Sequence, residues 1–239
     1  MLNQFSRTEL ILGKENVNKI RQSKVAVFGL GGVGSFVVEG LARAGVENFI
    51  LIDNDTISIT NLNRQLFALN STIGKNKVDV AKARILDINL NAKVEIHKEF
   101  VIDNFDNILD KSTNYIVDAI DTISAKINLV QKAKEINVPI ISSMGTGNKL
   151  DPTKLEVTDI KKTSICPVAK ILRKELKNRN IDKLKVVYST ETPILPNKEV
   201  QKEYIEYGEN ERTPGSVSFV PSVAGLIIAG EVIKDLIKE

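Results

Sequence analysis

The sequence is poor in cysteine and histidine, with one residue of each among its 239. Because Cys166 has no second thiol to pair with, the chain cannot form an intramolecular disulfide or a zinc site of several cysteines. A reducing compartment is therefore permitted. His97 ends a short apolar segment away from every motif described below, and we assign it no role.

Long apolar runs are also missing. The first residues, MLNQFSRTELILGKEN, lack the apolar core of a signal peptide. The apolar stretch near the C-terminus, residues 223–230, is far shorter than the roughly 20 residues that a membrane helix needs. We therefore expect a cytoplasmic protein that does not associate with membranes.

Neither sign of charge is in large excess, since the formal net charge is +3. The distribution is more informative than the total. Residues 161–185 hold nine basic side chains against Glu175 and Asp182, a local excess of seven positive charges, while residues 189–211 are acidic. Such a basic segment attracts a phosphate backbone. A solvated, lysine-rich helix face has the same composition. The basic positions are 161, 162, 170, 173, 174, 177, 179, 183 and 185.

Short apolar runs alternate with helical patterns through the first 150 residues. The patterns predict strands at 24–30, 49–53, 94–97, 115–120 and 139–143, and helices at 33–44, 74–89 and 124–136. Such alternation implies right-handed crossovers and a parallel sheet with helices on both faces. We therefore predict an α/β, Rossmann-like, mainly parallel sheet.

The pattern changes after residue 150. We expect strands at 155–160 and 184–188 around a helix at 167–179, and a final helix at 223–237. Prolines, glycines and charges over residues 190–215 predict a mobile loop. We interpret residues 1–239 as a single domain, with a core at 1–150 and an extension at 151–239.

A glycine cluster follows the first strand and opens the next helix. It reads Gly29, Leu30, Gly31, Gly32, Val33, Gly34. In this motif the first glycine permits a tight turn, the second lets a phosphate approach the backbone, and the last allows helix and strand to pack closely. Asp53 ends the second strand, where its carboxylate can accept hydrogen bonds from ribose hydroxyls. NAD and ATP fit these features equally well.

A polar loop after the second strand separates the two nucleotides. It contains Asp55, Asn61, Asn63, Arg64 and Gln65. Lys77 follows in the first turn of the next helix, so a guanidinium and an ammonium can converge on a triphosphate. Each residue also has an ordinary interpretation: a turn cap for Asp55, and a solvated surface residue for Arg64 or Lys77.

Two carboxylates end the fourth strand, at Asp118 and Asp121. A carboxylate at this edge, opposite the glycine loop, is suited to holding Mg²⁺. The simpler alternative for Asp121 is the N-cap of the next helix. Taken together, the order and spacing favour an ATP site over an NAD-linked dehydrogenase or a regulatory nucleotide-binding module.

The motifs GLGGVG, D-x-D, TNLNRQ, GKNK and DAIDT, in this order, resemble the superfamily of ubiquitin-activating-like enzymes. This superfamily includes the bacterial adenylyltransferases of molybdopterin and thiamine biosynthesis, and the resemblance covers residues 5–147. It implies that Asp53 binds ribose and that Asn61, Arg64 and Lys77 contact the ATP phosphates. It also implies that Asp121 binds Mg²⁺ and is needed for adenylation.

The same resemblance bears on two further residues. Arg7 resembles an arginine that reaches the phosphates of the partner subunit, which implies a homodimer. The family often has arginine five residues after the metal-linked aspartate, where this chain has Lys126. This lysine keeps the charge but loses the bidentate fork, so its role stays open.

The C-terminal third resembles one branch, the tRNA threonylcarbamoyladenosine dehydratases, through KKTSICPVAKILRKELKNRNI, VVYSTETP and RTPGSVSFVPSVAGLIIAGEVIKDL. The branch implies that ATP adenylates a threonylcarbamoyl carboxylate next to a tRNA anticodon, and that an internal nitrogen then closes a ring with loss of water. The implied partners are modified tRNA and sulfur-transfer proteins. We expect the acidic loop at 189–211 to order over bound tRNA. Residues 1–150 would then be the nucleotide-binding core of one adenylating domain, and residues 151–239 its extension facing the substrate and tRNA. The implied ions are Mg²⁺ and a monovalent cation, Na⁺ or K⁺. No general base is evident, so we expect the ring closure to depend on positioning.

An alternative in the same superfamily is an adenylyltransferase that activates the C-terminus of a small ubiquitin-like sulfur-carrier protein. Such enzymes usually carry two C-x-x-C zinc pairs, which this chain lacks, and many use a cysteine nucleophile. Cys166, which precedes Pro167 at a predicted helix start, is the single candidate. A small residue at a helix cap is the simpler interpretation of that cysteine.

Overall fold

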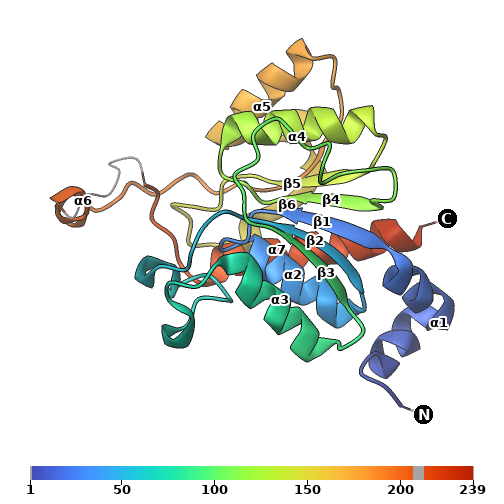
Figure 1. Ribbon diagram of the computed structural model, residues 1–239. Coiled ribbons are helices and arrows are strands. Elements are labelled where there is room, and N and C mark those ends of the chain that lie inside the picture. Colours follow the sequence, from blue (N-terminus) through green and yellow to red (C-terminus); the bar gives the residue numbers. More distant parts are fainter. Residues whose placement is uncertain (1, 207–212, 239) are drawn as a thin grey trace.

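A seven-stranded sheet runs through the computed structural model, which describes residues 2–206 and 213–238 (Figure 1). The strand order is β3-β2-β1-β4-β5-β7-β6, and only β6 and β7 pair antiparallel. The strands are β1 (Lys24–Phe28), β2 (Asn48–Ile52), β3 (Lys93–His97), β4 (Tyr115–Asp118), β5 (Ile140–Ser143), β6 (Leu155–Asp159) and β7 (Lys185–Ser189).

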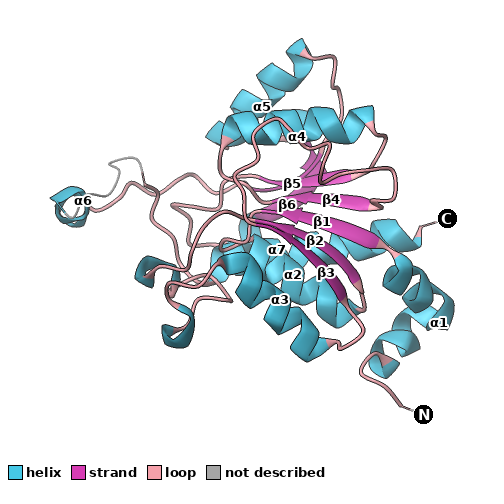
Figure 2. Cartoon of the chain, viewed as in Figure 1, coloured by secondary structure: helices cyan, strands magenta, loops and turns pink. Residues whose placement is uncertain are grey.

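Helices cover both faces of this sheet (Figure 2). One face carries α2, α3 and α7, the other carries α4 and α5, and α1 packs beside α7 near the chain termini. The helices are α1 (Ser6–Gln22), α2 (Gly34–Ala44), α3 (Lys77–Ile88), α4 (Ile123–Glu135), α5 (Pro167–Asn178), α6 (Lys198–Glu206) and α7 (Phe219–Ile237). The predicted mainly parallel Rossmann-like sheet is confirmed.

The sequence of strand β1 is a nearly continuous apolar run because both faces of the strand are buried. Side chains of a strand point alternately to opposite faces. Val25 and Val27 belong to the core under α2 and α7, while Ala26 and Phe28 belong to the core under α4. All four are fully buried. Because helices cover both faces of this strand, its sequence is apolar on both sides from residue 25 to residue 28.

The final helix packs very closely on α2. A Cβ atom added at Gly40 would lie 2.7 Å from the Ala229 side chain, and one at Gly225 would lie 2.4 Å from the Val33 carbonyl oxygen. Small residues on both helices therefore permit this contact. The helix begins four residues before the predicted position, 223, because Pro221 occupies its first turn, where a proline is tolerated.

A polar cluster fastens the end of α7 to the sheet. The Tyr115 hydroxyl donates to Asp235 at 2.7 Å, and Lys185 donates to the same carboxylate at 2.8 Å. Lys185 also lies 2.7 Å from Glu231. Burial alone would raise the pKa of Asp235, but hydrogen bonds from Lys185, Lys238 and Tyr115 lower it to about 2. The C-terminal helix is thus tied to β4 and β7.

Helix α1 was not predicted from the sequence. Leu10 and Ile11 are 86% and 85% exposed, and only Val17 and Ile20 of this helix are buried. The apolar positions therefore do not follow the helical period of a single buried face. Gly13, at φ 79°, also interrupts the regular backbone.

Helix α6 corrects the prediction of a loop over residues 190–215. Residues 198–206 are helical, and none of them is buried. Figure 1 shows α6 projecting away from the rest of the chain. Its polar sequence has no apolar face large enough to signal a packed helix. Residues 207–212 of the predicted loop lie outside the described residues. Among residues 2–206 and 213–238, no helix is long and apolar enough to cross a membrane.

Candidate functional site

A pocket of about 760 Å³ opens at the carboxyl edge of the parallel strands, where β1 and β4 are neighbours. The chain continues from β1 towards one edge of the sheet and from β4 towards the other, and doubly wound folds bind ligands at such a point. The loops after β1, β2, β3, β4 and β5 line the pocket, together with Val168 of α5 and residues 213, 214, 216 and 221.

The glycine loop forms one wall of this pocket. Gly29 has φ +86°, and a Cβ atom there would lie 2.6 Å from the Ala119 carbonyl oxygen. A Cβ atom at Gly34 would lie 1.8 Å from the Gly29 carbonyl oxygen, so both positions exclude a side chain. Beside Gly31 the nearest atom is 4.0 Å away, which leaves this backbone open to the pocket. The first N–H groups of α2 are bonded to loop carbonyls, whereas the N–H groups of residues 31–34 in the glycine loop make no hydrogen bond within residues 2–206 and 213–238 and suit an anion.

Asp53 joins the glycine loop to the loop after β2. Its Oδ2 accepts a hydrogen bond from the Leu30 N–H at 2.6 Å, and its Oδ1 accepts one from the Asp55 N–H at 2.9 Å. Burial raises the pKa of Asp53, against the opposing effects of the Lys77 charge and the two backbone hydrogen bonds. A carboxylate offers about four acceptor positions, so capacity remains for the hydroxyls of a ligand.

Lys77 lies behind the pocket wall and does not line it. It begins α3 and is 5% exposed. Its Nζ is 2.6 Å from Asp55 Oδ2 and 3.7 Å from Asp53 Oδ1. The structure therefore differs from the predicted convergence of Arg64 and Lys77 on a triphosphate, because two carboxylates hold the ammonium group. Its charge acts on the pocket through Asp53 and Asp55, which do line it.

We predict that Lys77→Met lowers the free energy of unfolding by about 1–3 kcal/mol, because the buried Asp53 carboxylate then loses its cation. ATP binding should weaken as well, since Asp53 is less well held. Urea unfolding and calorimetric titration with ATP measure the two effects. Lys75→Met is the matched control, because Lys75 is exposed on the same segment. Equal unfolding midpoints for the two variants would contradict this role of Lys77.

Asn61 and Asn63 shape the polar loop and do not line the pocket. The Asn61 side-chain oxygen accepts a hydrogen bond from the Ser58 N–H at 3.2 Å and completes a short 3-10 turn. The Asn63 amide donates to the Ser216 carbonyl at 2.9 Å. This bond links the polar loop to the segment that precedes α7.

Arg64 and Gln65 contribute side chains to the pocket wall itself. One terminal nitrogen of the Arg64 guanidinium donates to the Thr60 carbonyl at 2.8 Å and to the Asn63 side chain at 3.0 Å. Its other nitrogens make no hydrogen bond within residues 2–206 and 213–238 and stay available to a ligand. Gln65 is largely buried.

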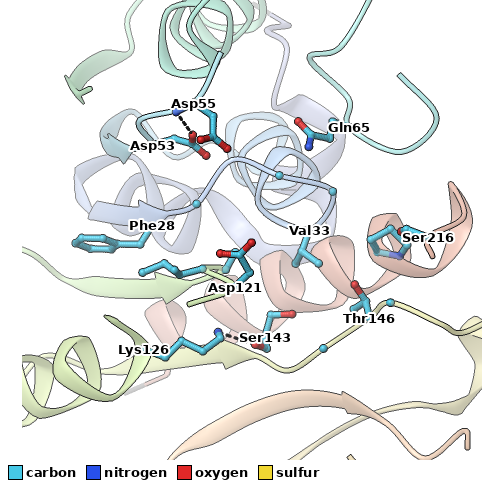
Figure 3. A pocket seen from close by; sticks show the side chains of 18 of the residues that line it. Phe28, Val33, Asp53, Asp55, Gln65, Asp121, Lys126, Ser143, Thr146 and Ser216 are labelled. Carbon is cyan, nitrogen blue, oxygen red and sulfur yellow. Dashed lines mark hydrogen bonds between the residues drawn. The ribbon is translucent and has the colours of Figure 1, made fainter. Parts of the chain in front are cut away.

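Asp121 stands across the pocket from the glycine loop (Figure 3). It is exposed, and in the described part of the chain its one hydrogen bond comes from the Thr122 hydroxyl at 3.4 Å. Helix α4 begins at Ile123 with Thr122 at the N-cap, and no side chain caps it. Asp121 therefore has neither a capping role nor a cationic partner.

The fit of the pocket to Mg²⁺ depends on the carboxylates that line it. No three His, Cys, Asp or Glu side chains among the described residues are grouped to hold a metal ion. In nucleotide sites, however, Mg²⁺ is commonly bound by one or two carboxylates together with phosphate oxygens and water. A single unpaired carboxylate at Asp121 fits that donor set.

Lys126 lies in a buried polar cluster at the floor of the pocket, and Figure 3 shows it beside Ser143. Its Nζ donates to Asp118 Oδ2 at 2.9 Å, to the Ser143 carbonyl at 2.8 Å and to the Ser142 hydroxyl at 3.3 Å. The Ser142 hydroxyl also donates to Asp118. Lys126 is 2% exposed and Asp118 fully buried, so each ion depends on the other.

This cluster controls the backbone that carries Asp121. The second oxygen of Asp118 accepts a hydrogen bond from the Ile120 N–H at 3.1 Å, which fixes the turn after β4. All three protons of the Lys126 ammonium have acceptors, so this lysine positions the turn and leaves no donor for a ligand.

We predict that Lys126→Met lowers the free energy of unfolding by about 3–5 kcal/mol, because Asp118 is left as an unpaired buried charge. Lys126→Arg should retain more stability and activity, since it keeps the cation. The double variant Lys126→Met with Asp118→Asn should recover part of the loss. Urea unfolding measures all three. Lys161→Met, in an exposed pair with Asp182, is the control and should change stability by less than about 1 kcal/mol. A double variant no more stable than the single one would contradict the pairing.

The wall opposite the polar loop was not predicted from the sequence. It contains Ser143, Met144, Gly145, Thr146 and Gly147, which follow β5. The signal that could have revealed it is the pair of glycines directly after a parallel strand, since loops at this edge of the sheet converge on the ligand.

Asn148 links this wall to residues 194 and 215, which lie before and after α6 in the chain. Its side-chain oxygen accepts the Gly215 N–H at 2.7 Å, and its own N–H donates to the Gly215 carbonyl at 2.7 Å. Its carbonyl accepts the Ile194 N–H at 2.9 Å. Both ends of the stretch from 194 to 215 are thus held at the pocket.

The structure therefore brings together most of the predicted site residues. Those that line the pocket are Gly29, Gly31, Gly32, Asp53, Asp55, Arg64, Gln65 and Asp121. Those outside its wall are Gly34, Asn61, Asn63, Lys77 and Arg7. Arg7 is exposed on α1, next to Phe5, whose ring packs on Gly45 at the amino edge of the strands. It therefore lies near the amino edge of the strands, whereas the pocket of its own chain lies at their carboxyl edge.

The remaining candidates from the sequence take no part in the pocket. Cys166 is 4% exposed and occupies the N-cap of α5. His97 contacts Glu95 at 2.8 Å and Glu99 at 3.3 Å. Neither residue lines the pocket.

Comparison with known proteins agrees with this geometry. Residues 4–239 match the model of the ThiF family, and the chain belongs to that family. It is similar over its whole length to the tRNA threonylcarbamoyladenosine dehydratase of Bacillus subtilis (strain 168), with 46% identity over 245 residues, 100% of this chain and 96% of the relative. The Escherichia coli (strain K12) protein of the same name is 35% identical and is matched over 81% of this chain and 75% of its own.

Solved structures of a dehydratase with this name are similar to this chain in fold. The E. coli tRNA N6-threonylcarbamoyladenosine dehydratase in complex with AMP superposes with a TM-score of 0.87 and 30% identity, covering 98% of this chain and 93% of that one. The complex of that protein with ATP gives 0.84 and 29% over the same shares. The resemblance predicted from the sequence is therefore confirmed.

Proposed function

We propose that this chain catalyses the ATP-dependent cyclisation of threonylcarbamoyladenosine next to the anticodon of tRNA. The observation that carries the proposal is 46% identity, over the full chain, to a protein of that name. The pocket supports it independently, because a glycine loop, a ribose-binding carboxylate, an arginine and an unpaired aspartate surround one cavity.

ATP binding follows from the walls of the pocket. The N–H groups of residues 31–34 in the glycine loop, which have no partner within the described residues, hold phosphate oxygens. Asp53 accepts hydrogen bonds from the ribose hydroxyls. The unpaired nitrogens of Arg64 bind phosphate as a planar fork.

The first step activates the substrate. An oxygen of the threonylcarbamoyl carboxylate attacks the α-phosphorus of ATP, the bond from that phosphorus to the bridging oxygen breaks, and pyrophosphate leaves. Arg64 and the free amides of the glycine loop stabilise the charge that develops on the phosphates. Asp121 would hold Mg²⁺, and the ion would supply further positive charge at the same place.

The second step closes the ring. A nitrogen of the same group attacks the acyl carbon, the bond from that carbon to the AMP oxygen breaks, and AMP leaves while the nitrogen releases its proton to solvent. The sum of the two steps removes one water from the nucleoside. Since both reacting atoms belong to one substrate, the wall at residues 143–147 needs only to position them. A thioester is not required, which agrees with the burial of Cys166.

A pyrophosphate exchange assay separates this function from activation of a sulfur-carrier protein. We expect labelled pyrophosphate to enter ATP when tRNA carrying threonylcarbamoyladenosine is present. We expect no exchange with a ubiquitin-like carrier protein. Exchange that depends on the carrier and ignores the modified tRNA would refute the proposal.

We also propose a homodimer in the cytoplasm, in which Arg7 completes the partner's site. The supporting observations are the exposed Leu10 and Ile11 beside Arg7 on α1, and the distance of this helix end from its own pocket. Na⁺ or K⁺ binding and pairing with sulfur-transfer proteins stay predictions of the resemblance.

The shared site predicts complementation between two inactive variants. Mixed dimers of Arg7→Ala and Asp121→Ala chains contain one site with both native residues. Co-refolding the two variants should therefore restore adenylation that neither shows alone, with sedimentation confirming a dimer. Lack of recovery in a mixed dimer would show that Arg7 serves no partner site.

A further inference from the structure

The basic segment at residues 161–185 divides into paired and unpaired charges. Four basic side chains have protein partners: Lys161 with Asp182, Arg173 with Thr163, Arg179 with Glu175, and Lys185 with Glu231 and Asp235. Five are exposed and make no hydrogen bond or ion pair through their side chains within residues 2–206 and 213–238: Lys162, Lys170, Lys174, Lys177 and Lys183. The two acidic residues of the segment are both already paired. The excess positive charge is therefore not neutralised by the protein.

Three of the unpaired lysines lie on one face of α5. Lys170, Lys174 and Lys177 are spaced by four and three residues, which places them on one line along a helix. With a rise of about 1.5 Å per residue, the line extends over about 10 Å. We call these three residues the α5 ridge. The opposite face of the helix is buried through Ala169, Leu172 and Leu176.

The α5 ridge starts beside the pocket. Val168, two residues before Lys170, lines the pocket, so the first turn of α5 stands at its rim. Figure 1 shows α5 outside α4, with its far end directed away from the sheet. A tRNA strand whose modified nucleoside entered the pocket would therefore pass close to Lys170.

We infer that the α5 ridge binds the phosphates that flank the modified nucleoside in the anticodon arm of tRNA; this rests on the proposed function. A line of three ammonium groups about 10 Å long can contact successive phosphates of one nucleic acid strand. Lysine ammonium groups bind phosphates as point charges and read no bases. The ridge thus supplies affinity and orientation, while the pocket selects the nucleoside.

The test compares the full-length wild-type protein with two triple variants, each of which loses three positive charges. One carries Lys170→Gln, Lys174→Gln and Lys177→Gln. The matched control carries Lys82→Gln, Lys93→Gln and Lys111→Gln, at lysines of α3 and of the amino edge of the sheet, away from the pocket. Binding of threonylcarbamoylated tRNA is measured by fluorescence anisotropy over a range of salt concentrations, and conversion by nucleoside mass analysis.

The ridge variant should bind the tRNA at least about 10-fold more weakly, with a salt slope reduced by about 2–3, because each lost phosphate contact removes nearly one unit. Its affinity for ATP and its kcat at saturating tRNA should equal those of the wild type, and the control should match the wild type throughout. Equal tRNA affinity and salt slope in both variants would contradict the proposed role of the α5 ridge, whether or not the nucleoside is converted. Loss of tRNA binding by the ridge variant alone would support the ridge even if the wild type converted nothing, a result that would refute only the proposed function.

Discussion

Asp121→Asn should reduce the rate of acyl-adenylate formation by at least about 10³-fold while the fold stays intact. The side chain has no cationic partner and no capping role, and it faces the glycine loop across the pocket. Its carboxylate is therefore available to bind a metal ion that also contacts the phosphates. Replacing it with a neutral amide removes the charge and keeps the shape.

The assay for Asp121→Asn is pyrophosphate exchange at saturating ATP and modified tRNA, with thermal unfolding in parallel. Asp87→Asn is the matched control, since Asp87 is exposed on α3 away from the pocket. Both variants should unfold at the wild-type temperature, because neither aspartate is buried. Normal exchange by Asp121→Asn would contradict its assignment to the metal and the reaction.

Arg64→Ala should lower the rate of adenylate formation by on the order of 10²-fold or more, since a preorganised charge at the phosphates is lost. Arg64→Lys should recover little of that rate. Only the guanidinium can hold the Thr60 carbonyl with one nitrogen and present others to a phosphate in the same plane.

Single-turnover kinetics with modified tRNA measure both Arg64 variants. Arg43→Ala serves as the control, because Arg43 pairs with Glu39 on the exposed last turn of α2. Its rate should equal that of the wild type. A fully active Arg64→Lys enzyme would show that a point charge is sufficient and would contradict the bidentate role.

The fold was largely predictable because its central strands are buried on both sides. Residues 25–28 of β1 are apolar and fully buried, so its sequence identifies it directly. Helices α1 and α6 were missed for the opposite reason. Their apolar side chains, such as Leu10 and Ile11, mostly face solvent, and a periodic pattern records only a face that is buried.

The site was predictable where a short motif fixes the backbone. Gly29 and Gly34 have no room for a side chain, and Asp53 is bound to the same loop, so local sequence determines this half of the pocket. The other half depends on contacts such as that of Asn148 with Gly215, 67 residues apart. No local pattern encodes such a contact. The position of Lys77 behind the wall likewise depends on two carboxylates that compete for its charge.

The most direct measurement is incubation of the protein with ATP, Mg²⁺ and tRNA carrying threonylcarbamoyladenosine, followed by mass analysis of the nucleosides. The account predicts a cyclic nucleoside lighter by one water, with one AMP and one pyrophosphate released for each ring formed. An unchanged nucleoside, with the protein folded and ATP bound, would contradict it.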